Sequence, residues 1–211
     1  MFNKRTISIL LICLNLILSG VVVAQQRPAP ATGKYQVSLD LTQVKDDKIQ
    51  VSVQVPKITQ SEIIYNMPKI VPGTYSISDF GRFVNELKAL DKNGNALAVE
   101  RLDTNRWKIS NAGRLHKITY WIDDTFDANT PLNAIFEPGG TNIETDKNFL
   151  LNPFGVIGYL EGMKQVPYEL NITKPQGFYG STPLIAKSTT ATRDTYLVPN
   201  YVELADSPLM Y

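Results

Sequence analysis

Few residues of this chain have side chains suited to catalysis. Its 211 residues include one histidine, His116, and one cysteine, Cys13. A catalytic zinc site normally takes three protein ligands, most often with two or more histidines, and an activated serine needs a histidine base. His116 lies on the same predicted strand face as Ile118 and Tyr120, and the sequence offers it no partner, so we interpret it as a structural residue. The sequence therefore predicts no catalytic residue and no metal ligand in this chain.

Acidic residues offer two alternatives. Asp123, Asp124 and Asp127 follow a predicted strand and could surround a calcium ion, but no further ligand spacing supports the ion, so a solvated loop is favoured. A pair of carboxylates for glycoside hydrolysis could come from several positions, and no spacing selects one pair. These positions are Glu62, Asp79, Glu100, Glu137 and Glu161.

The segment from Pro68 to Asn85, PKIVPGTYSISDFGRFVN, combines two flexible points with aromatic and charged side chains. In one interpretation, Asp79 and Arg82 form an ion pair that fixes the loop. In the other, the loop presents an aromatic ring and a carboxylate to a ligand or to a neighbouring domain. The residues of this candidate loop are Pro72, Gly73, Tyr75, Asp79 and Arg82.

The elements that position this loop are predicted to be strands. Residues 35–41 and 49–55 alternate between apolar and polar side chains around the polar turn 45–48, which predicts a hairpin. The dipeptide Asn93-Gly94 predicts a second hairpin turn with positive backbone angles. Further predicted strands cover residues 62–67, 83–90, 96–100, 106–110, 115–122, 149–151, 156–160, 168–173 and 195–198.

Helical periodicity is missing from the sequence after residue 24, which decides the fold class. The predicted fold is all-β, a mostly antiparallel two-layer sandwich or a strongly bent sheet. The composition is that of a folded domain, with 43% hydrophobic and 19% charged residues. The formal net charge is only +1, so no basic field is expected to bind nucleic acid.

The first 24 residues have the features of a cleavable signal peptide. Lys4 and Arg5 precede an apolar run over residues 7–23, and small residues mark a cleavage point after Ala24. The run is interrupted and too short for a membrane span, so no stable membrane anchor is expected. Residues 25–33, QQRPAPATG, are predicted to be a flexible tether. The protein is therefore expected to be exported to a periplasmic or extracellular location.

Several motifs, in order along the chain, resemble one family. Residues 67–82 resemble a W-x-P-G-x-Y-x-x-x-D-F-x-R segment, and residues 201–208, YVELADSP, look like a Y-x-E-L-x-D-S-P motif. Asp91 to Gly94, Leu102 to Trp107 and Phe149 to Gly162 fall between them. Together they resemble the amino-terminal domain of the glycyl aminopeptidase family of zinc metallopeptidases, peptidase family sixty-one. One departure is that Ile70-Val71 replaces the aromatic residue before Pro-Gly.

The resemblance implies a domain organisation and a role. Residues 34–200 would be the β-rich amino-terminal domain, and residues 201–211 would begin the connection to a catalytic domain that this chain lacks. That domain would hold the zinc ion and the general base. The parent enzyme would remove amino-terminal Gly or Ala from a peptide substrate. The present chain would be a noncatalytic accessory domain that packs on the catalytic domain, with its candidate loop walling one side of the cleft.

A second interpretation, from a different class, remains open on the sequence. The chain could be a freestanding exported β-sandwich that binds peptide or carbohydrate through exposed aromatic side chains. Whether the chain is part of a longer protein separates the two interpretations, because the accessory role needs a catalytic domain. The aromatic residues that this alternative names are Tyr75, Phe80, Trp107 and Trp121.

Overall fold

The structure, a computed structural model, describes residues 33–71, 75–126 and 134–211. The predicted signal peptide, residues 1–24, and the tether up to residue 32 lie outside these ranges. Within the described ranges, no helix has both the length and the apolar character that crossing a bilayer requires.

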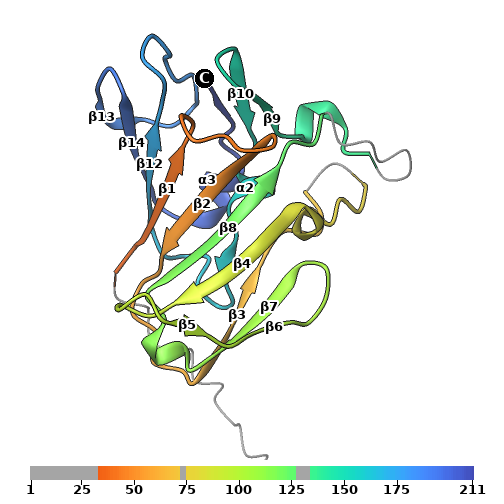
Figure 1. Cartoon of the computed structure of the whole chain (residues 1–211), viewed down its shortest axis with the longest axis vertical. Coiled ribbons are helices and arrows are strands. Elements are labelled where there is room, and N and C mark those ends of the chain that lie inside the picture. The colour runs from red at the N-terminus through yellow and green to blue at the C-terminus, as the bar shows by residue number, and fades with distance from the viewer. Residues whose placement is uncertain (1–32, 72–74, 127–133) are drawn as a thin grey trace, which may run out of the picture. The chain divides into compact units, whose positions relative to one another are not determined.

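One large sheet contains eight strands. Their bounds are β1 (Tyr35–Asp40), β2 (Lys48–Gln54), β4 (Val84–Leu90), β5 (Ala96–Leu97), β8 (Lys117–Asp123), β12 (Tyr168–Thr173), β13 (Ala186–Thr189) and β14 (Arg193–Val198). The order across the sheet is β13-β14-β12-β1-β2-β8-β4-β5, and β1, β2, β8 and β4 run side by side in Figure 1. Strands β1 and β12 pair in parallel, whereas the other described neighbours are antiparallel.

Two smaller sheets complete the strands. One has the order β11-β3-β7-β6 and the other has the order β15-β10-β9. Their strands are β3 (Glu62–Asn66), β6 (Val99–Arg101), β7 (Arg106–Ser110), β9 (Asn142–Glu144), β10 (Asn148–Leu151), β11 (Tyr159–Leu160) and β15 (Leu209–Met210).

Helical segments in the described residues are short. They are η1 (Phe80–Phe83), η2 (Ala112–Arg114), η3 (Glu137–Gly139), α2 (Pro153–Val156) and α3 (Tyr201–Ala205). Figure 1 shows α2, α3 and β3 behind the large sheet, on the same side of it. The prediction of an all-β, mostly antiparallel fold is confirmed.

The core lies between the large sheet and the elements behind it. Alternation places Val37, Val51 and Ile118 on the inner face, where each is fully buried. Their polar neighbours along the strands lie on the outer face. The Tyr65 hydroxyl of β3 lies 2.8 Å from the Tyr120 hydroxyl of β8, so one hydrogen bond joins two sheets across the core. The arrangement is a two-layer packing with one polar outer face.

A group of buried tyrosines surrounds residues 156–160, and we call it the tyrosine cage. This segment runs from the end of α2 through Ile157 and Gly158 to β11, and β11 pairs with β3 on one side only. The cage supplies hydrogen-bond partners for the backbone of the segment: Tyr65 and Tyr35 hydroxyls accept from Gly158 N and Leu160 N at 3.0 and 3.1 Å. Tyr120 and Tyr201 hydroxyls donate to the carbonyls of residues 156 and 157 at 3.0 and 2.7 Å. The members of the cage are Tyr35, Tyr65, Tyr120, Tyr168 and Tyr201.

The hairpin of residues 35–41 and 49–55 is confirmed by antiparallel pairing of β1 with β2. The predicted strand 156–160 is wrong in its first half, because Pro153 begins α2 and a strand forms only at 159–160. The turn at Asn93-Gly94 is also different from expectation, since only Gly94 has a positive φ, +82°. Asp91 N donates to the Asn95 carbonyl, so the loop between them holds residues 92–94, one more than a two-residue hairpin loop.

The last residues pack into the domain and do not lead away from it. Tyr201 and Leu204 of α3 are buried, and β15 pairs with β10. The Tyr211 hydroxyl lies 3.3 Å from that of Tyr196. Burial of these apolar side chains packs residues 201–211 against the β-domain, and their expected role as the start of a connection stays a prediction.

Candidate functional site

The candidate loop is closed at its base by backbone hydrogen bonds. Ser78 N and Asp79 N both donate to the Lys69 carbonyl, at 2.9 and 3.0 Å, and Phe80 N donates to the Pro68 carbonyl. These bonds bring the end of β3 next to the start of η1. Pro72 and Gly73 lie outside the described residues, so the structure places three of the five predicted residues: Tyr75, Asp79 and Arg82.

Phe80 and Gly81 fix the loop to the core. The Phe80 side chain is only 2% exposed, and its ring centroid lies 5.2 Å from that of Phe154. A Cβ atom at Gly81 would lie 2.1 Å from the Thr104 carbonyl oxygen, so only glycine allows this contact. The loop therefore rests on an apolar anchor and on a close approach of two backbone segments.

Asp79 is held by Asn105, which sequence reasoning missed. Asp79 has φ 49°, in the left-handed region, and its Oδ1 accepts from Asn105 Nδ2 at 2.7 Å. Asn105 Oδ1 in turn accepts from Gly81 N at 3.0 Å. Asn105 is buried, and both the oxygen and the nitrogen of its side-chain amide have a hydrogen-bond partner. Its position between Asp103 and Trp107, two landmarks of the family resemblance, was the one available signal.

Arg82 does not use its guanidinium to hold Asp79 as the ion-pair interpretation expected. Its Nε donates to the Ser78 carbonyl at 3.1 Å, and the guanidinium lies 4.5 Å over the Phe83 ring. The two residues are joined through the backbone instead, where Arg82 N donates to the Asp79 carbonyl. The loop is thus fixed by an amide and by backbone bonds, and Asp79 borders a cavity.

This cavity has a volume of about 320 Å³ and a mixed polar lining. On the wall of the cavity, the Asp103 side chain forms an Asx turn, in which its Oδ1 accepts a hydrogen bond from Asn105 N. Its Oδ2 accepts from Arg106 Nε at 2.7 Å. These hydrogen bonds lower the pKa of Asp103 below its ordinary value. The carboxylates are therefore hydrogen-bond acceptors, suited to positioning the loop. The lining residues are Asn66, Met67, Lys69, Asp79, Asp103, Thr104, Asn105, Arg106 and Tyr159.

The exposed part of the loop includes three large apolar side chains, beside the polar Lys69 and Ser76. Tyr75 is fully exposed, Ile77 is 56% exposed, and Ile70 on the other limb is 48% exposed. Tyr75 also has a positive φ, 53°, which is uncommon for a residue with a side chain. An exposed tyrosine and two isoleucines on an anchored loop form a surface suited to contact with another protein part.

The four aromatic residues of the binding alternative do not form an exposed set. Trp107 is 4% exposed and Phe80 is 2% exposed, so both belong to the core, contrary to that expectation. Trp121 is half-buried on the outer face of β8. Only Tyr75 is fully exposed, so the structure removes most of the aromatic surface that this alternative requires.

The acidic candidates have structural roles in the described residues. Asp123 bonds Lys48 and Asn85, and Asp124 accepts from Phe126 N and Ile143 N at 2.6 and 2.5 Å. The third candidate, Asp127, lies outside the described ranges. Across residues 33–71, 75–126 and 134–211, no group of three or more His, Cys, Asp or Glu is placed to hold a metal ion.

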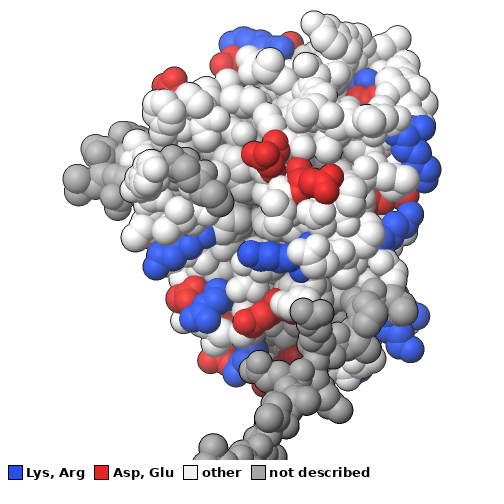
Figure 2. Space-filling model, turned by 180° about the vertical axis from the view of Figure 1, so that it is seen from behind, with Lys and Arg blue, Asp and Glu red and all other residues white. Residues whose placement is uncertain are grey.

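Charges on the face shown in Figure 2 are mixed in sign. Lysines and arginines alternate there with aspartates and glutamates, and uncharged areas lie between them. A protein that binds nucleic acid nonspecifically needs a continuous basic surface. This face does not provide one.

The fold and the site together describe a two-layer β-domain with an anchored loop and an exposed apolar tip. The chain belongs to the Peptidase M61 N-terminal domain family, whose match covers residues 34–211. The family resemblance that the sequence motifs indicated is confirmed. A search of curated proteins found no match.

Solved structures that match this chain belong to longer proteins. An aminopeptidase N family protein from Idiomarina loihiensis is similar with a TM-score of 0.71 and 20% identity, over 83% of this chain and 29% of that chain. The M1 zinc metallopeptidase from Deinococcus radiodurans has a TM-score of 0.44 and 10% identity, over 84% of this chain and 41% of that one. The matched part of the present chain covers less than half the length of each of these proteins.

Proposed function

We propose that this chain is the noncatalytic amino-terminal accessory domain of an exported metalloaminopeptidase that removes small residues, Gly or Ala, from peptides. The observation that carries the proposal is the family match over residues 34–211. The I. loihiensis structure supports it, because a similar domain there makes up 29% of a longer aminopeptidase N family protein.

In this role the candidate loop contacts the catalytic domain in cis and walls one side of its cleft. The support is geometric: hydrogen bonds and Phe80 hold the base of the loop, whereas Tyr75 and Ile77 are exposed. Interface cores favour tyrosine and apolar residues that need little ordering on binding. A loop that is already held in place meets that requirement.

Zinc belongs to the catalytic domain in this proposal. The described residues of the present chain do not fit a zinc site, since they contain no cluster of suitable ligands and a single imidazole. We therefore derive no catalytic step from this chain. Its contribution is to position and to enclose.

The experiment that tests the proposal has two stages. The coding sequence after the Tyr211 codon is read first, and we expect an in-frame H-E-x-x-H zinc motif. The longer protein is then produced with Tyr75→Ala and assayed on alanyl and glycyl anilides. We expect a several-fold loss of kcat/KM with unchanged thermal unfolding.

Tyr179→Ala is the matched control, because Tyr179 is an exposed tyrosine too, at 80% exposure, and lines a different cavity. It should leave kcat/KM unchanged. A stop codon after Tyr211, or equal activity of the two variants, would contradict the accessory role of the loop.

A further inference from the structure

A second cavity lies at the opposite end of β4 from the candidate loop. Its volume is about 580 Å³, and three segments form it: residues 55–58 after β2, residues 91–93 after β4 and residues 113–116 before β8. Strands β2, β8 and β4 are neighbours in the large sheet, so their connections meet at one edge. The volume falls within the range of small-molecule sites.

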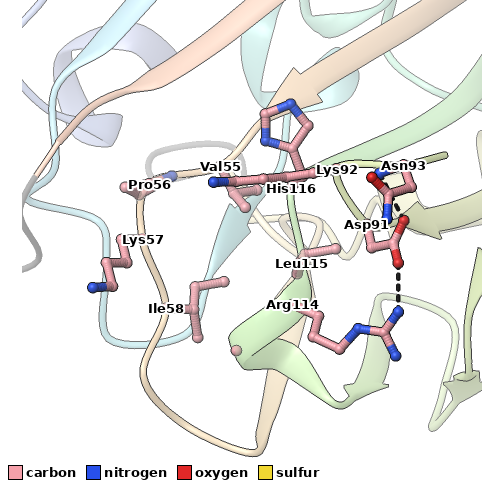
Figure 3. A pocket seen from close by; sticks show the side chains of 11 residues that line it. Val55, Pro56, Lys57, Ile58, Asp91, Lys92, Asn93, Arg114, Leu115 and His116 are labelled. Carbon is pink, nitrogen blue, oxygen red and sulfur yellow. Dashed lines mark hydrogen bonds and ion pairs between the residues drawn. The ribbon is translucent and has the colours of Figure 1, made fainter. Parts of the chain in front are cut away.

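The cavity has an apolar floor and a basic rim. Ile58 and Leu115 are buried, at 4% and 7% exposure. Lys57 and Lys92 are exposed, and His116 is half-buried. In Figure 3, Lys92 extends from the turn across the cavity toward Val55, whereas Arg114 points the other way, to Asp91.

The single carboxylate of the lining is fully engaged. Asp91 accepts from Asn93 N and Asn95 N, each at 2.9 Å, and from Arg114 Nη2 at 2.6 Å. Burial opposes ionisation, but the bonds from Asn95 and Arg114 outweigh it and hold the pKa of Asp91 below its usual value. Asp91 is therefore ionised and paired with Arg114, and it makes no ion pair with Lys57 or Lys92.

The two lysines are therefore left as uncompensated charges at the cavity. Among the residues that the structure describes, no carboxylate lies within ion-pair distance of Lys57 or Lys92. Several other lysines have such partners, including Lys34, Lys108 and Lys187. A concave surface with one sign of charge and an apolar floor concentrates anions at its mouth.

We propose that this cavity binds a small organic carboxylate with an apolar body. The carboxylate would lie beside Lys92 and His116, with Lys57 adding positive charge from the outer edge of the cavity, and the apolar body would cover Ile58 and Leu115. The carboxyl-terminal residue of a short peptide belongs to this chemical class. The site is separate from the candidate loop and does not depend on the proposed function.

The probe is N-acetyl-leucinate, and the reporter is His116, the only imidazole of the chain. In an untagged sample, its ring resonances and the amide resonances of residues 55–58 and 113–116 should shift saturably in NMR titrations. We expect a Kd on the order of 1 mM, as for a ligand of about a dozen heavy atoms. The neutral analogue N-acetyl-leucinamide should give no saturable shift over the same concentrations.

Substitutions separate charge from apolar contact. The double variant Lys57→Met and Lys92→Met should raise Kd at least about tenfold, since both charges are lost. Lys45→Met, an exposed lysine at the other end of β2, is the matched control and should leave Kd unchanged. Lys92→Arg, which keeps the charge, should bind within about threefold of the original protein.

Three results would overturn the proposal. Equal binding of the amide would exclude a role for the carboxylate, and an unchanged Kd in the double lysine variant would exclude the basic rim. Inorganic phosphate that shifts the same resonances with equal affinity would exclude the apolar part of the site.

Discussion

The tyrosine cage and the candidate loop differ in where their side chains lie: the cage tyrosines are buried, whereas the residues at the tip of the loop are exposed. In the cage, buried side chains satisfy the backbone of residues 156–160, and every hydroxyl points inward. In the loop, Asn105 and two backbone carbonyls satisfy the base, and the tip residues Tyr75 and Ile77 point away from the core. The cage residues therefore hold the fold together, whereas the tip residues are available for contact with another part of a protein.

The difference also concerns the position of the polar groups. A buried hydroxyl has no water to replace a lost partner, so each cage bond contributes to stability through the cost of leaving it unmade. The exposed ring of Tyr75 makes no such contribution. Changes in the cage should therefore lower stability, and changes at the tip should alter contacts while stability stays constant.

Alkaline pH should have the largest effect on the cage. Burial raises the pKa of all five cage tyrosines above the ordinary value. Stability is therefore complete below about pH 10, the pKa of an unfolded tyrosine, and falls as the pH rises because the unfolded state releases protons that the folded state keeps. Each cage tyrosine should remove up to about 1.4 kcal/mol per pH unit above that value.

The measurement is a pH titration of tyrosinate absorbance together with circular dichroism. We expect the cage tyrosines to ionise only as the β-sheet signal is lost. Ionisation of all the tyrosines near pH 10 with an intact sheet signal would contradict the buried cage.

Gly158→Ala should have the next largest effect. A Cβ atom there would lie 2.4 Å from the Asn66 carbonyl oxygen and 2.7 Å from the Tyr65 ring, and both residues are buried. We expect a loss of more than about 3 kcal/mol, or failure to fold. Gly139→Ala is the control, because its nearest neighbour would be 4.0 Å away. Urea unfolding of the two variants makes the comparison, and equal midpoints would refute the close packing at Gly158.

Tyr65→Phe should have an intermediate effect. The substitution keeps the ring but leaves Gly158 N without its acceptor and Tyr120 without its neighbour. We expect a loss of about 1–3 kcal/mol by urea unfolding. An unchanged stability would mean that the cage hydrogen bonds are dispensable and that only its rings matter.

Asn105→Ala sharpens the comparison from the side of the loop. It removes the amide that joins Asp79 to Gly81 N, so we expect a loss of about 1–2 kcal/mol and faster proteolysis within residues 68–80. Tyr75→Ala, at the exposed tip, should change stability by less than about 0.5 kcal/mol. A larger loss for Tyr75→Ala than for Asn105→Ala would reverse the assignment of anchor and tip.

The sequence predicted the regular strands well because alternation is a local property. The segments 106–110 and 168–173 were predicted with the bounds that the structure shows. The contacts that hold the loop could not be predicted this way, because Asn105 is 26 residues away from Asp79 in sequence. The tyrosine cage could not be predicted from the sequence for the same reason, since the Tyr35 hydroxyl bonds a backbone group 125 residues later.

The role of the candidate loop stays a prediction. The motif singled out the loop, whereas the exposure of Tyr75 and the position of Asp79 at a cavity are known only from the structure. In one of the two interpretations of the loop, the partner of Asp79 was Arg82, because opposite charges close in sequence suggest an ion pair. In the structure a buried amide, Asn105, satisfies both the carboxylate and a backbone N–H, which an arginine cannot do because it has no acceptor.

In the proposed accessory role, this chain positions a loop against a catalytic domain that supplies the chemistry. The most direct test incubates the purified chain with alanyl and glycyl anilides, with and without zinc, and measures turnover together with bound zinc. The account predicts no turnover above the buffer rate and no stoichiometric zinc. Turnover that disappears on chelation and returns with one equivalent of zinc would contradict it.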